Sequence, residues 1–285
     1  MAVRVIGIIG AGTMGNGIAQ LAAQNGFDVV MRDIEDDLVQ DGLDTIERNL
    51  QEAEERDIID EADVVFERIT GTTELKDVTE NASFIIEAVS EDMDLKQEIF
   101  KELDTEANSD VVLGSNTSSL SITEIASVTD NPERVLGTHF FNPPVKMKLV
   151  ELITGHNTSS ETVEQAEKLA TDFGRESIVV DDFPGFATSR LGLVLGMEAA
   201  RMVQEGVASP EDIDTAMELG YNHPMGPLKL GDYNGWDTRV KVGEYLAEEL
   251  GSEVYRPPQI VKKMVRAGDY GVKTGEGFYN WDEEK

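Results

Sequence analysis

The stretch from Val5 to Asp33 places a glycine-rich turn between a short apolar run and a helical pattern. The run VIGII is too short for a helix and is typical of a strand that is buried on both faces. Gly10, Gly12 and Gly15 follow it with the spacing G-x-G-x-x-G. The first glycine permits a tight turn, the second lets the backbone approach a pyrophosphate, and the third lets the helix pack closely on the strand. The sequence therefore predicts a strand–turn–helix unit that binds a dinucleotide.

An acidic residue follows the next predicted strand and selects between the two nicotinamide cofactors. The second strand is expected over residues 27–31, and Asp33 comes just after its end. A carboxylate there accepts hydrogen bonds from the ribose hydroxyls and repels a 2′-phosphate, which favours NAD over NADP. Arg32 leaves the alternative open, because a neighbouring arginine can accommodate the additional phosphate.

Strand and helix patterns alternate over the first two thirds of the chain. A long polar segment, residues 34–63, predicts a helical hairpin, and apolar strands alternate with helices after it. Further strands are expected at 69–75, 83–89, 111–115, 134–140, 146–153 and 177–180, and helices at 94–103 and 160–173. This alternation predicts an α/β fold with a Rossmann-type, mostly parallel sheet.

The pattern changes near Pro184, after which strand signals almost vanish. Helices are expected there at 191–203, 210–219, 237–250 and 258–267. We therefore predict two domains, a dinucleotide-binding domain over residues 1–183 and an all-helical domain over residues 184–285. The helical domain has apolar faces that fit pairing with a second copy of the chain, so a homodimer is expected.

The charge of the chain is strongly acidic. It has 56 Asp and Glu against 24 Lys and Arg, for a formal net charge of −32. Such a field repels nucleic acids and anionic membranes, so neither is an expected partner. The excess acid is interpreted as a solvated surface of the kind that suits concentrated salt, and an ordinary acidic protein is the alternative. No metal site is expected, and the 285-residue chain has no Cys. With no signal before a first strand that starts by Val3, and no long apolar run, a cytoplasmic location is expected.

Candidate catalytic residues follow the predicted strands, where an open α/β sheet binds its ligands. Residues 114–119 and 138–142 supply hydroxyls, amides and one imidazole, that of His139. Glu151 ends an apolar run in the next strand. A carboxylate holds an imidazole in one tautomer and stabilises its protonated form, so this pair is a candidate acid–base couple. A structural role for His139 is the alternative, whereas His156 and His223 lie in predicted turns.

Several longer motifs resemble the short-chain L-3-hydroxyacyl-CoA dehydrogenases, especially the bacterial-type 3-hydroxybutyryl-CoA dehydrogenases. The matching segments include GAGTMGNGIA, IIEAVSEDMDLKQEIF, SNTSSLSIT, GTHFFNPP, MKLVE, EDIDTAMELG, HPMGPLKLGDY and KTGEGFYNW. The resemblance covers essentially the whole chain. It implies an NAD-binding domain, a helical dimerisation domain and NAD-dependent oxidation of (S)-3-hydroxyacyl-CoA, with 3-hydroxybutyryl-CoA as the expected substrate.

The resemblance also assigns roles to single residues. Those that match the family's catalytic residues are His139 as the base, Glu151 as its partner and Ser118 near the reacting oxygen. Those that match cofactor residues are Gly10, Gly12, Met14, Gly15, Asp33, Glu91, Lys96, Asn142 and Lys273. Ser118, Asn142 and Ser189 occupy substrate positions.

Two departures from the family pattern concern the substrate. Ser189 stands where the family usually has Asn, so the hydrogen bond to the substrate is made by a shorter side chain, made through a water molecule, or not made at all. In the helical hairpin, where some relatives have Ser and Lys that grip coenzyme A, residues 43–67 contain only Arg48 and Arg56 as bases.

Two other functions remain open from the sequence. One is a related NAD-dependent dehydrogenase that acts on a free hydroxy acid or sugar acid. The other is a non-catalytic protein that binds a dinucleotide or an acyl-CoA. Turnover of acetoacetyl-CoA and of free acids separates these possibilities.

Overall fold

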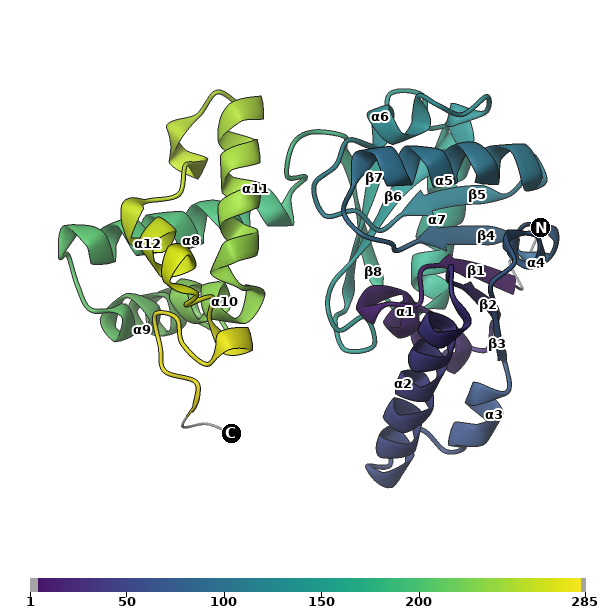
Figure 1. The fold of residues 1–285 in the computed structure, drawn as a ribbon, viewed down its shortest axis with the longest axis horizontal. Helices are drawn as coiled ribbons and strands as arrows, with labels where there is room; N and C mark the ends of the chain where they lie inside the picture. The colour runs from purple at the N-terminus through teal and green to yellow at the C-terminus, as the bar shows by residue number, and fades with distance from the viewer. Residues whose placement is uncertain (1–4, 283–285) are drawn as a thin grey trace. The chain divides into compact units, whose positions relative to one another are not determined.

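The computed structural model describes residues 5–282 of the chain (Figure 1). The chain divides into two compact units, Met1–Phe183 and Pro184–Lys285. The expected start of the first strand at Val3 lies outside the described residues.

The first unit alternates strands and helices. Its strands are β1 (Val5–Ile9), β2 (Asp28–Arg32), β3 (Ile69–Thr72), β4 (Phe84–Glu87), β5 (Val112–Ser115), β6 (Val135–Phe140), β7 (Leu149–Thr154) and β8 (Glu176–Asp181). Its helices are α1 (Thr13–Gln24), α2 (Asp36–Glu55), α3 (Ala62–Phe66), α4 (Leu75–Asn81), α5 (Met93–Glu106), α6 (Ile122–Ala126), the 3-10 helix η1 (Pro132–Arg134) and α7 (Ser160–Asp172).

The described strands form one eight-stranded sheet in the order β3-β2-β1-β4-β5-β6-β7-β8. Neighbouring strands from β3 to β6 pair in parallel, β6 and β7 pair antiparallel, and β7 and β8 are again parallel. The Rossmann-type, mostly parallel sheet that the sequence predicts is therefore confirmed. The change of direction at β7 brings the sixth and seventh strands together as a hairpin-like pair, and both predicted acid–base residues lie on it.

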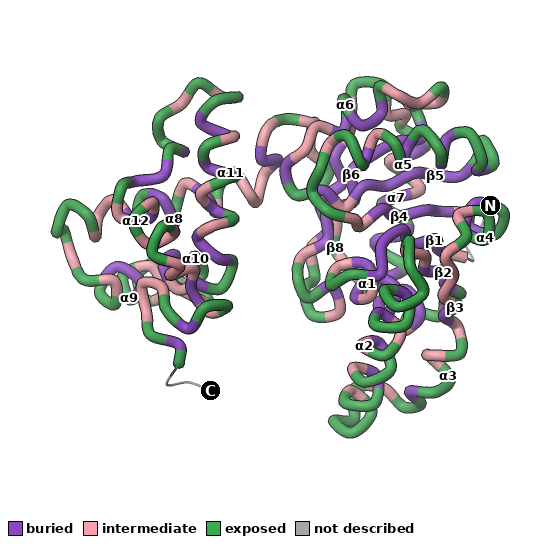
Figure 2. Tube along the Cα trace, viewed as in Figure 1, coloured by how far each residue is buried: buried purple, intermediate pink, exposed green. Residues whose placement is uncertain are grey.

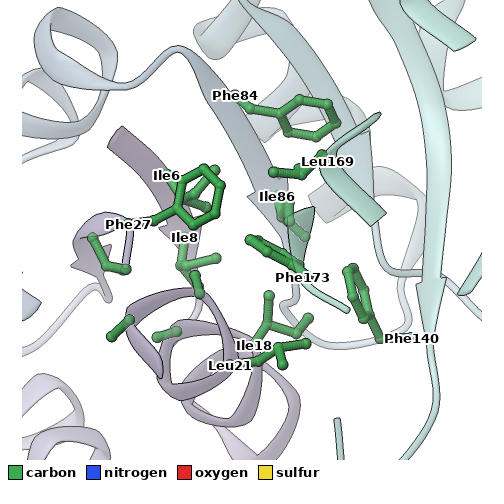
Figure 3. Packing of buried hydrophobic residues seen from close by; sticks show 14 of the residues in the cluster. Ile6, Ile8, Ile18, Leu21, Phe27, Phe84, Ile86, Phe140, Leu169 and Phe173 are labelled. Carbon is green, nitrogen blue, oxygen red and sulfur yellow. The ribbon is translucent and has the colours of Figure 1, made fainter. Parts of the chain in front are cut away.

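A continuous apolar cluster joins the sheet to α1 and α7 (Figure 3). Ile6 and Ile8 of β1 are fully buried against Ile18 of α1. The rings of Phe27 and Phe173 meet edge to face, with 5.3 Å between their centroids. Because these side chains belong to one packed core, the turn between β1 and α1 is held on a rigid base.

The glycine turn itself depends on the absence of side chains. Gly10 has φ +102°, a conformation that L residues rarely adopt. A Cβ atom on Gly15 would lie 1.8 Å from the carbonyl oxygen of Gly10, so no side chain fits there. The helix therefore starts directly against the end of the strand, as the motif predicts.

Several strand boundaries differ from the sequence prediction: the strand expected over 83–89 ends at Glu87, the one expected over 146–153 starts at Leu149, and β3 is also shorter. The strand expected over residues 69–75 ends at Thr72, and α4 starts at Leu75. The hydroxyl of Thr72 accepts a hydrogen bond from the backbone N–H of Glu74 and donates one to Asp77. This local side-chain turn ends the strand, and it competes with the extended conformation in a way that apolar periodicity does not reveal.

The helical hairpin after Asp33 is formed by α2 and α3, which contact each other. The helical hairpin predicted over residues 34–63 is therefore present, with α3 ending at Phe66. Ile46 and Leu50 of α2 are fully buried, whereas the acidic residues of the helix are exposed. Figure 2 shows that much of α2 is exposed.

The regular elements of the second unit are helices over its described residues, apart from isolated β-bridges between Gly271 and Glu276 and between Glu276 and Asn280. It contains α8 (Thr188–Glu205), α9 (Pro210–Tyr221), α10 (Pro227–Asn234), α11 (Trp236–Glu249), α12 (Gln259–Ala267) and the 3-10 helices η2 (Glu253–Tyr255) and η3 (Val272–Thr274). The helix α10 differs from the sequence prediction, which has no helix there, because its eight residues contain Gly231 and carry too short an apolar pattern.

A buried carboxylate organises the core of this unit. Asp232 of α10 is fully buried and accepts hydrogen bonds from the indole N–H groups of Trp236 and Trp281, at 2.6 and 2.8 Å. It also accepts bonds from the backbone N–H groups of Phe278 and Tyr279. These four donors satisfy the buried charge and fasten the GFYNW segment to the helices.

Candidate functional site

The amino end of α1 is open to an anionic ligand. Gly12 is exposed, and a Cβ atom built on it would have no neighbour within 4 Å. The first turn of α1 contains no acidic residue, and no side chain caps it. Unpaired backbone N–H groups and the positive end of the helix dipole therefore face this space, which fits the pyrophosphate of a dinucleotide.

Asp33 lies beside this turn, as the sequence predicts. Its Oδ2 accepts a hydrogen bond from the backbone N–H of Ala11 at 2.7 Å. The side chain of Arg32 forms a hydrogen bond within the protein, because its Nε donates to the carbonyl oxygen of Thr73 at 3.2 Å. The arrangement favours a cofactor with a free ribose 2′-hydroxyl, which is NAD.

The pair of His139 and Glu151 is assembled by the antiparallel register of β6 and β7. The two residues lie directly opposite each other, so their side chains share one face of the sheet. Nδ1 of His139 lies 2.7 Å from Oε2 of Glu151. Glu151 is fully buried and His139 is 6% exposed. A hydrogen bond of this kind fixes the imidazole tautomer and the orientation of the ring.

Asn116 supports the end of the strand that carries His139. Its Oδ1 accepts a hydrogen bond from the backbone N–H of Phe140 at 2.9 Å. The ring of Phe141 lies against the imidazole, with 4.6 Å between the centroids. Asn116 lies in the predicted site segment 114–119, but its sequence pattern does not distinguish it from its neighbours.

Ser118 lies in the loop after β5, and Glu91 holds this loop. Oε1 of Glu91 accepts hydrogen bonds from the hydroxyl of Thr117 at 2.7 Å and from the backbone N–H of Ser118 at 2.9 Å. Ser118 itself is exposed. The segments after β4 and β5 therefore converge at this end of the sheet.

Lys96, which the family resemblance assigns to the cofactor, is buried between two carboxylates in the structure. Its side chain is 1% exposed, and its Nζ lies 2.6 Å from Oε1 of Glu87 and 3.6 Å from Oε2 of Glu91. Glu87 is fully buried at the end of β4. Glu87 lies within the predicted strand 83–89 but was not predicted as a site residue, because an acid at the end of an apolar run has no distinctive sequence signal.

Asn142 lies at the rim of a cavity of about 250 Å³. The cavity is lined by α1, α2 and the loop of the cis peptide Asn142-Pro143. Its polar lining residues are Thr13, Asn16, Gln20, Thr45, Asn49 and Asn142. These neutral donors and acceptors suit an uncharged polar group better than a densely charged one. Met14, another predicted cofactor residue, packs partly buried against the core instead of lining this cavity.

The remaining two predicted site residues belong to the second unit. Ser189 lies in the first turn of α8. Lys273 lies in η3, and its ammonium group forms an ion pair with Asp237. The other predicted site residues all belong to the first unit.

The structure contains no other obvious chemical centre in its described part. Between residues 5 and 282, no group of three or more His, Asp or Glu side chains is arranged to hold a metal ion. No described helix is long and apolar enough to cross a membrane. His156 is exposed, and its backbone N–H donates to Thr123, in agreement with a turn role.

Comparison with known proteins identifies the class to which this site belongs. The family model described as 3-hydroxyacyl-CoA dehydrogenase, NAD binding domain, matches residues 5–183. The model of the C-terminal domain of the same enzymes matches residues 185–281. The chain is thus an NAD-dependent oxidoreductase, as the glycine turn and Asp33 also indicate.

Individual relatives match along nearly the whole chain. A probable 3-hydroxybutyryl-CoA dehydrogenase of Bacillus subtilis is 45% identical, and the match covers 100% of this chain and 99% of the relative. The human mitochondrial hydroxyacyl-coenzyme A dehydrogenase is 37% identical over 98% of this chain and 91% of its own. The crystal structure of (S)-3-hydroxybutyryl-CoA dehydrogenase from Ralstonia eutropha has a TM-score of 0.95 at 43% identity, and covers 99% of this chain and 100% of its own. The protein belongs to the 3-hydroxyacyl-CoA dehydrogenase family.

Proposed function

We propose that this enzyme oxidises (S)-3-hydroxybutyryl-CoA to acetoacetyl-CoA with NAD, and catalyses the reverse reduction. The observation that carries the proposal is the pair of His139 and Glu151, whose side chains are 2.7 Å apart at the edge where the loops of the first unit converge. An NAD-dependent dehydrogenase needs a group that exchanges a proton with the substrate oxygen, and this imidazole is built for that task.

His139 and Glu151 have different roles in the proposed reaction. Glu151 engages Nδ1 of His139, so the imidazole meets the substrate hydroxyl through Nε2. In oxidation His139 removes the proton of the 3-hydroxyl, and Glu151 stabilises the imidazolium that results. In reduction His139 returns the proton to the oxygen. NAD, when bound, supplies the two-electron acceptor or donor for carbon C3 of the substrate.

The substrate and the cofactor are held by neighbouring groups. Ser118 donates to the reacting oxygen, and Asn142 and Ser189 orient the acyl chain. The glycine turn and Asp33 hold the cofactor, and Glu91 and Lys273 are proposed as further cofactor residues. The first unit is in this proposal the NAD-binding domain, residues 1–183, and the second, residues 184–285, is the helical substrate and dimerisation domain.

A cytoplasmic homodimer is proposed with this activity. Leu191 and Leu195 are 67% and 42% exposed and lie one turn apart on α8. Leu219 and Tyr221 of α9 are 83% and 76% exposed. Large exposed apolar side chains of this kind mark protein–protein contacts, which supports pairing of two copies through the helical unit. A cytoplasmic location suits NAD and acyl-CoA, which are metabolites of the cell interior.

The substrate class is tested by comparing acetoacetyl-CoA with free acids. We expect NADH oxidation with acetoacetyl-CoA, and a kcat/KM at least two orders of magnitude lower with free acetoacetate, because the free acid makes none of the contacts of the carrier arm and adds a charge. The assay follows NADH absorbance at matched salt concentration. Equal or greater activity on free hydroxy acids or sugar acids would contradict a CoA thioester as the substrate and support the alternative substrate class.

The second prediction concerns the cofactor. NADH is expected to exceed NADPH in kcat/KM by about tenfold or more, which corresponds to ~1.4 kcal/mol of repulsion at Asp33. Asp33→Ser should reduce that ratio, because it removes the charge and keeps an acceptor for the N–H of Ala11. A wild-type enzyme that uses NADPH at least as well as NADH would show that Arg32, and not Asp33, selects the cofactor.

A further inference from the structure

A fully buried acid, Glu87, lies at the centre of the sheet beneath the site. In the strand register it is adjacent to Ile9, the last residue before the glycine turn, and to Ser115, which precedes the Ser118 loop. Oε1 of Glu87 accepts hydrogen bonds from Nζ of Lys96 at 2.6 Å and from the backbone N–H of Val89 at 2.7 Å. Oε2 accepts one from the hydroxyl of Ser115 at 2.6 Å.

The contacts continue from Glu87 to the surface of the site. Lys96 extends from α5 and places its ammonium group between two carboxylates, that of Glu87 and, at 3.6 Å, that of Glu91. The other oxygen of Glu91 holds the loop through the hydroxyl of Thr117 and the backbone N–H of Ser118. A single chain of polar contacts thus joins the interior of the sheet to Ser118.

The burial of Glu87 and Lys96 reduces the stability of the folded state, and a functional role would explain why both residues are present. Taking Glu87 and Lys96 out of water carries a desolvation penalty that a packed apolar pair would not have. We infer that Glu87 is a positioning residue, which fixes the ammonium of Lys96 and, through Glu91, sets the loop that presents Ser118 to the substrate. Lys96 then acts through Glu91 instead of touching the cofactor. The inference rests on the proposed function, in which Ser118 contacts the reacting oxygen.

The test separates positioning from stability by removing both buried charges together. Glu87→Gln and Lys96→Met each leave one charge without its partner, and both single variants should lose thermal stability. The double variant has no unpaired buried charge, so its melting temperature should return toward that of the wild type. Its kcat for acetoacetyl-CoA should nevertheless remain lower by on the order of 10–100-fold, because the Ser118 loop has lost its anchor. The affinity for NADH should change much less than kcat.

A second buried ion pair in the same unit provides a matched control. Arg134 and Asp104 are 5% and 4% exposed in their side chains, and 2.8 Å separates Nη2 from Oδ1. This pair joins α5 to η1, and its side-chain hydrogen bonds among the described residues go to the segments 108–111 and 130–131 instead of the Ser118 loop. The double variant Asp104→Asn, Arg134→Met should therefore change stability while kcat stays at the wild-type value. A loss of kcat in the control as large as that in the Glu87 and Lys96 double variant would overturn the inference.

Combining the double variant with Ser118→Ala tests whether the loss of kcat caused by the Glu87 and Lys96 substitutions acts through Ser118. If Glu87 acts by placing that hydroxyl, adding the Glu87 and Lys96 substitutions to Ser118→Ala should reduce kcat little further. Losses that multiply would contradict the inference, as would an NADH affinity that falls as much as kcat, because Lys96 would then act on the cofactor. Wild-type turnover in the same assay distinguishes a failure of the proposed dehydrogenase function from a failure of the role inferred for Glu87. An inactive wild type refutes the proposed function, whereas an active wild type with an equally active double variant refutes only the role of Glu87.

Discussion

Replacing His139 by Gln is expected to lower kcat for acetoacetyl-CoA reduction by roughly two to four orders of magnitude. Glutamine removes the group that exchanges the proton, but its amide can still donate to Glu151. That donor matters, because Glu151 is fully buried and would otherwise lose its hydrogen bond with the side chain at position 139. The dissociation constant for NADH should remain close to the wild-type value, since the glycine turn and Asp33 are unchanged. Steady-state kinetics and NADH fluorescence titration measure the two quantities.

His156→Gln is the matched control for this substitution. It makes the same chemical change at an exposed turn residue, and its kcat should equal that of the wild type. Turnover of the His139 variant within a few-fold of the wild type would remove His139 from the role of the base. It would leave the hydrogen bond to Glu151 as a structural feature of the β6–β7 pair.

The second large effect is expected from salt. A net charge of −32 makes the folded chain repel itself and its anionic substrate. The Debye length is about 10 Å at 0.1 M ionic strength and about 3 Å at 1 M, so concentrated salt largely removes repulsion between neighbouring carboxylates. We therefore expect the melting temperature and the activity to rise between ~0.1 M and ~2 M KCl, since both depend on this screening. Thermal unfolding and NADH oxidation across the series measure the two responses.

Helix α2 offers a way to show that surface charge causes the salt response. Asp41, Asp44, Glu47 and Glu52 are all exposed on this helix. Replacing them with the corresponding amides removes charge without removing packed side chains, so the variant should need less KCl to reach the same melting temperature. Full activity and an unchanged melting temperature of the wild type at 0.1 M would contradict the salt proposal. The acidity would then be that of an ordinary protein.

Much of the fold follows from local sequence signals. The glycine spacing predicts the first strand, turn and helix because Gly10 and Gly15 have conformational and steric requirements that other residues do not meet. The alternation of apolar strands and helices likewise predicts the sheet. His139 and Glu151 could be proposed as a pair from the strands that carry them. Their alignment depends on the antiparallel register of β6 and β7, which only the structure specifies.

Other features depend on contacts between residues that are distant in the sequence. Glu87 and Lys96 look like a strand end and an exposed helical lysine, yet the helix α5 turns the lysine inward to a buried acid. Asn116 resembles the hydroxyl-rich residues around it, and its bond to Phe140 appears only when β5 and β6 are adjacent. The short helices α4 and α6 were missed because seven and five residues hold too little periodicity to distinguish them from turns.

The most direct test of the account is to measure NADH binding and turnover on the same sample of wild-type enzyme. With acetoacetyl-CoA in concentrated KCl, we expect saturable NADH binding, and one NADH consumed for each molecule of (S)-3-hydroxybutyryl-CoA that forms. Separation of the product on a chiral phase identifies its configuration. An enzyme that binds NADH and acetoacetyl-CoA but consumes neither, at any salt concentration in the series, would contradict the assignment of His139 and Glu151 as a catalytic pair.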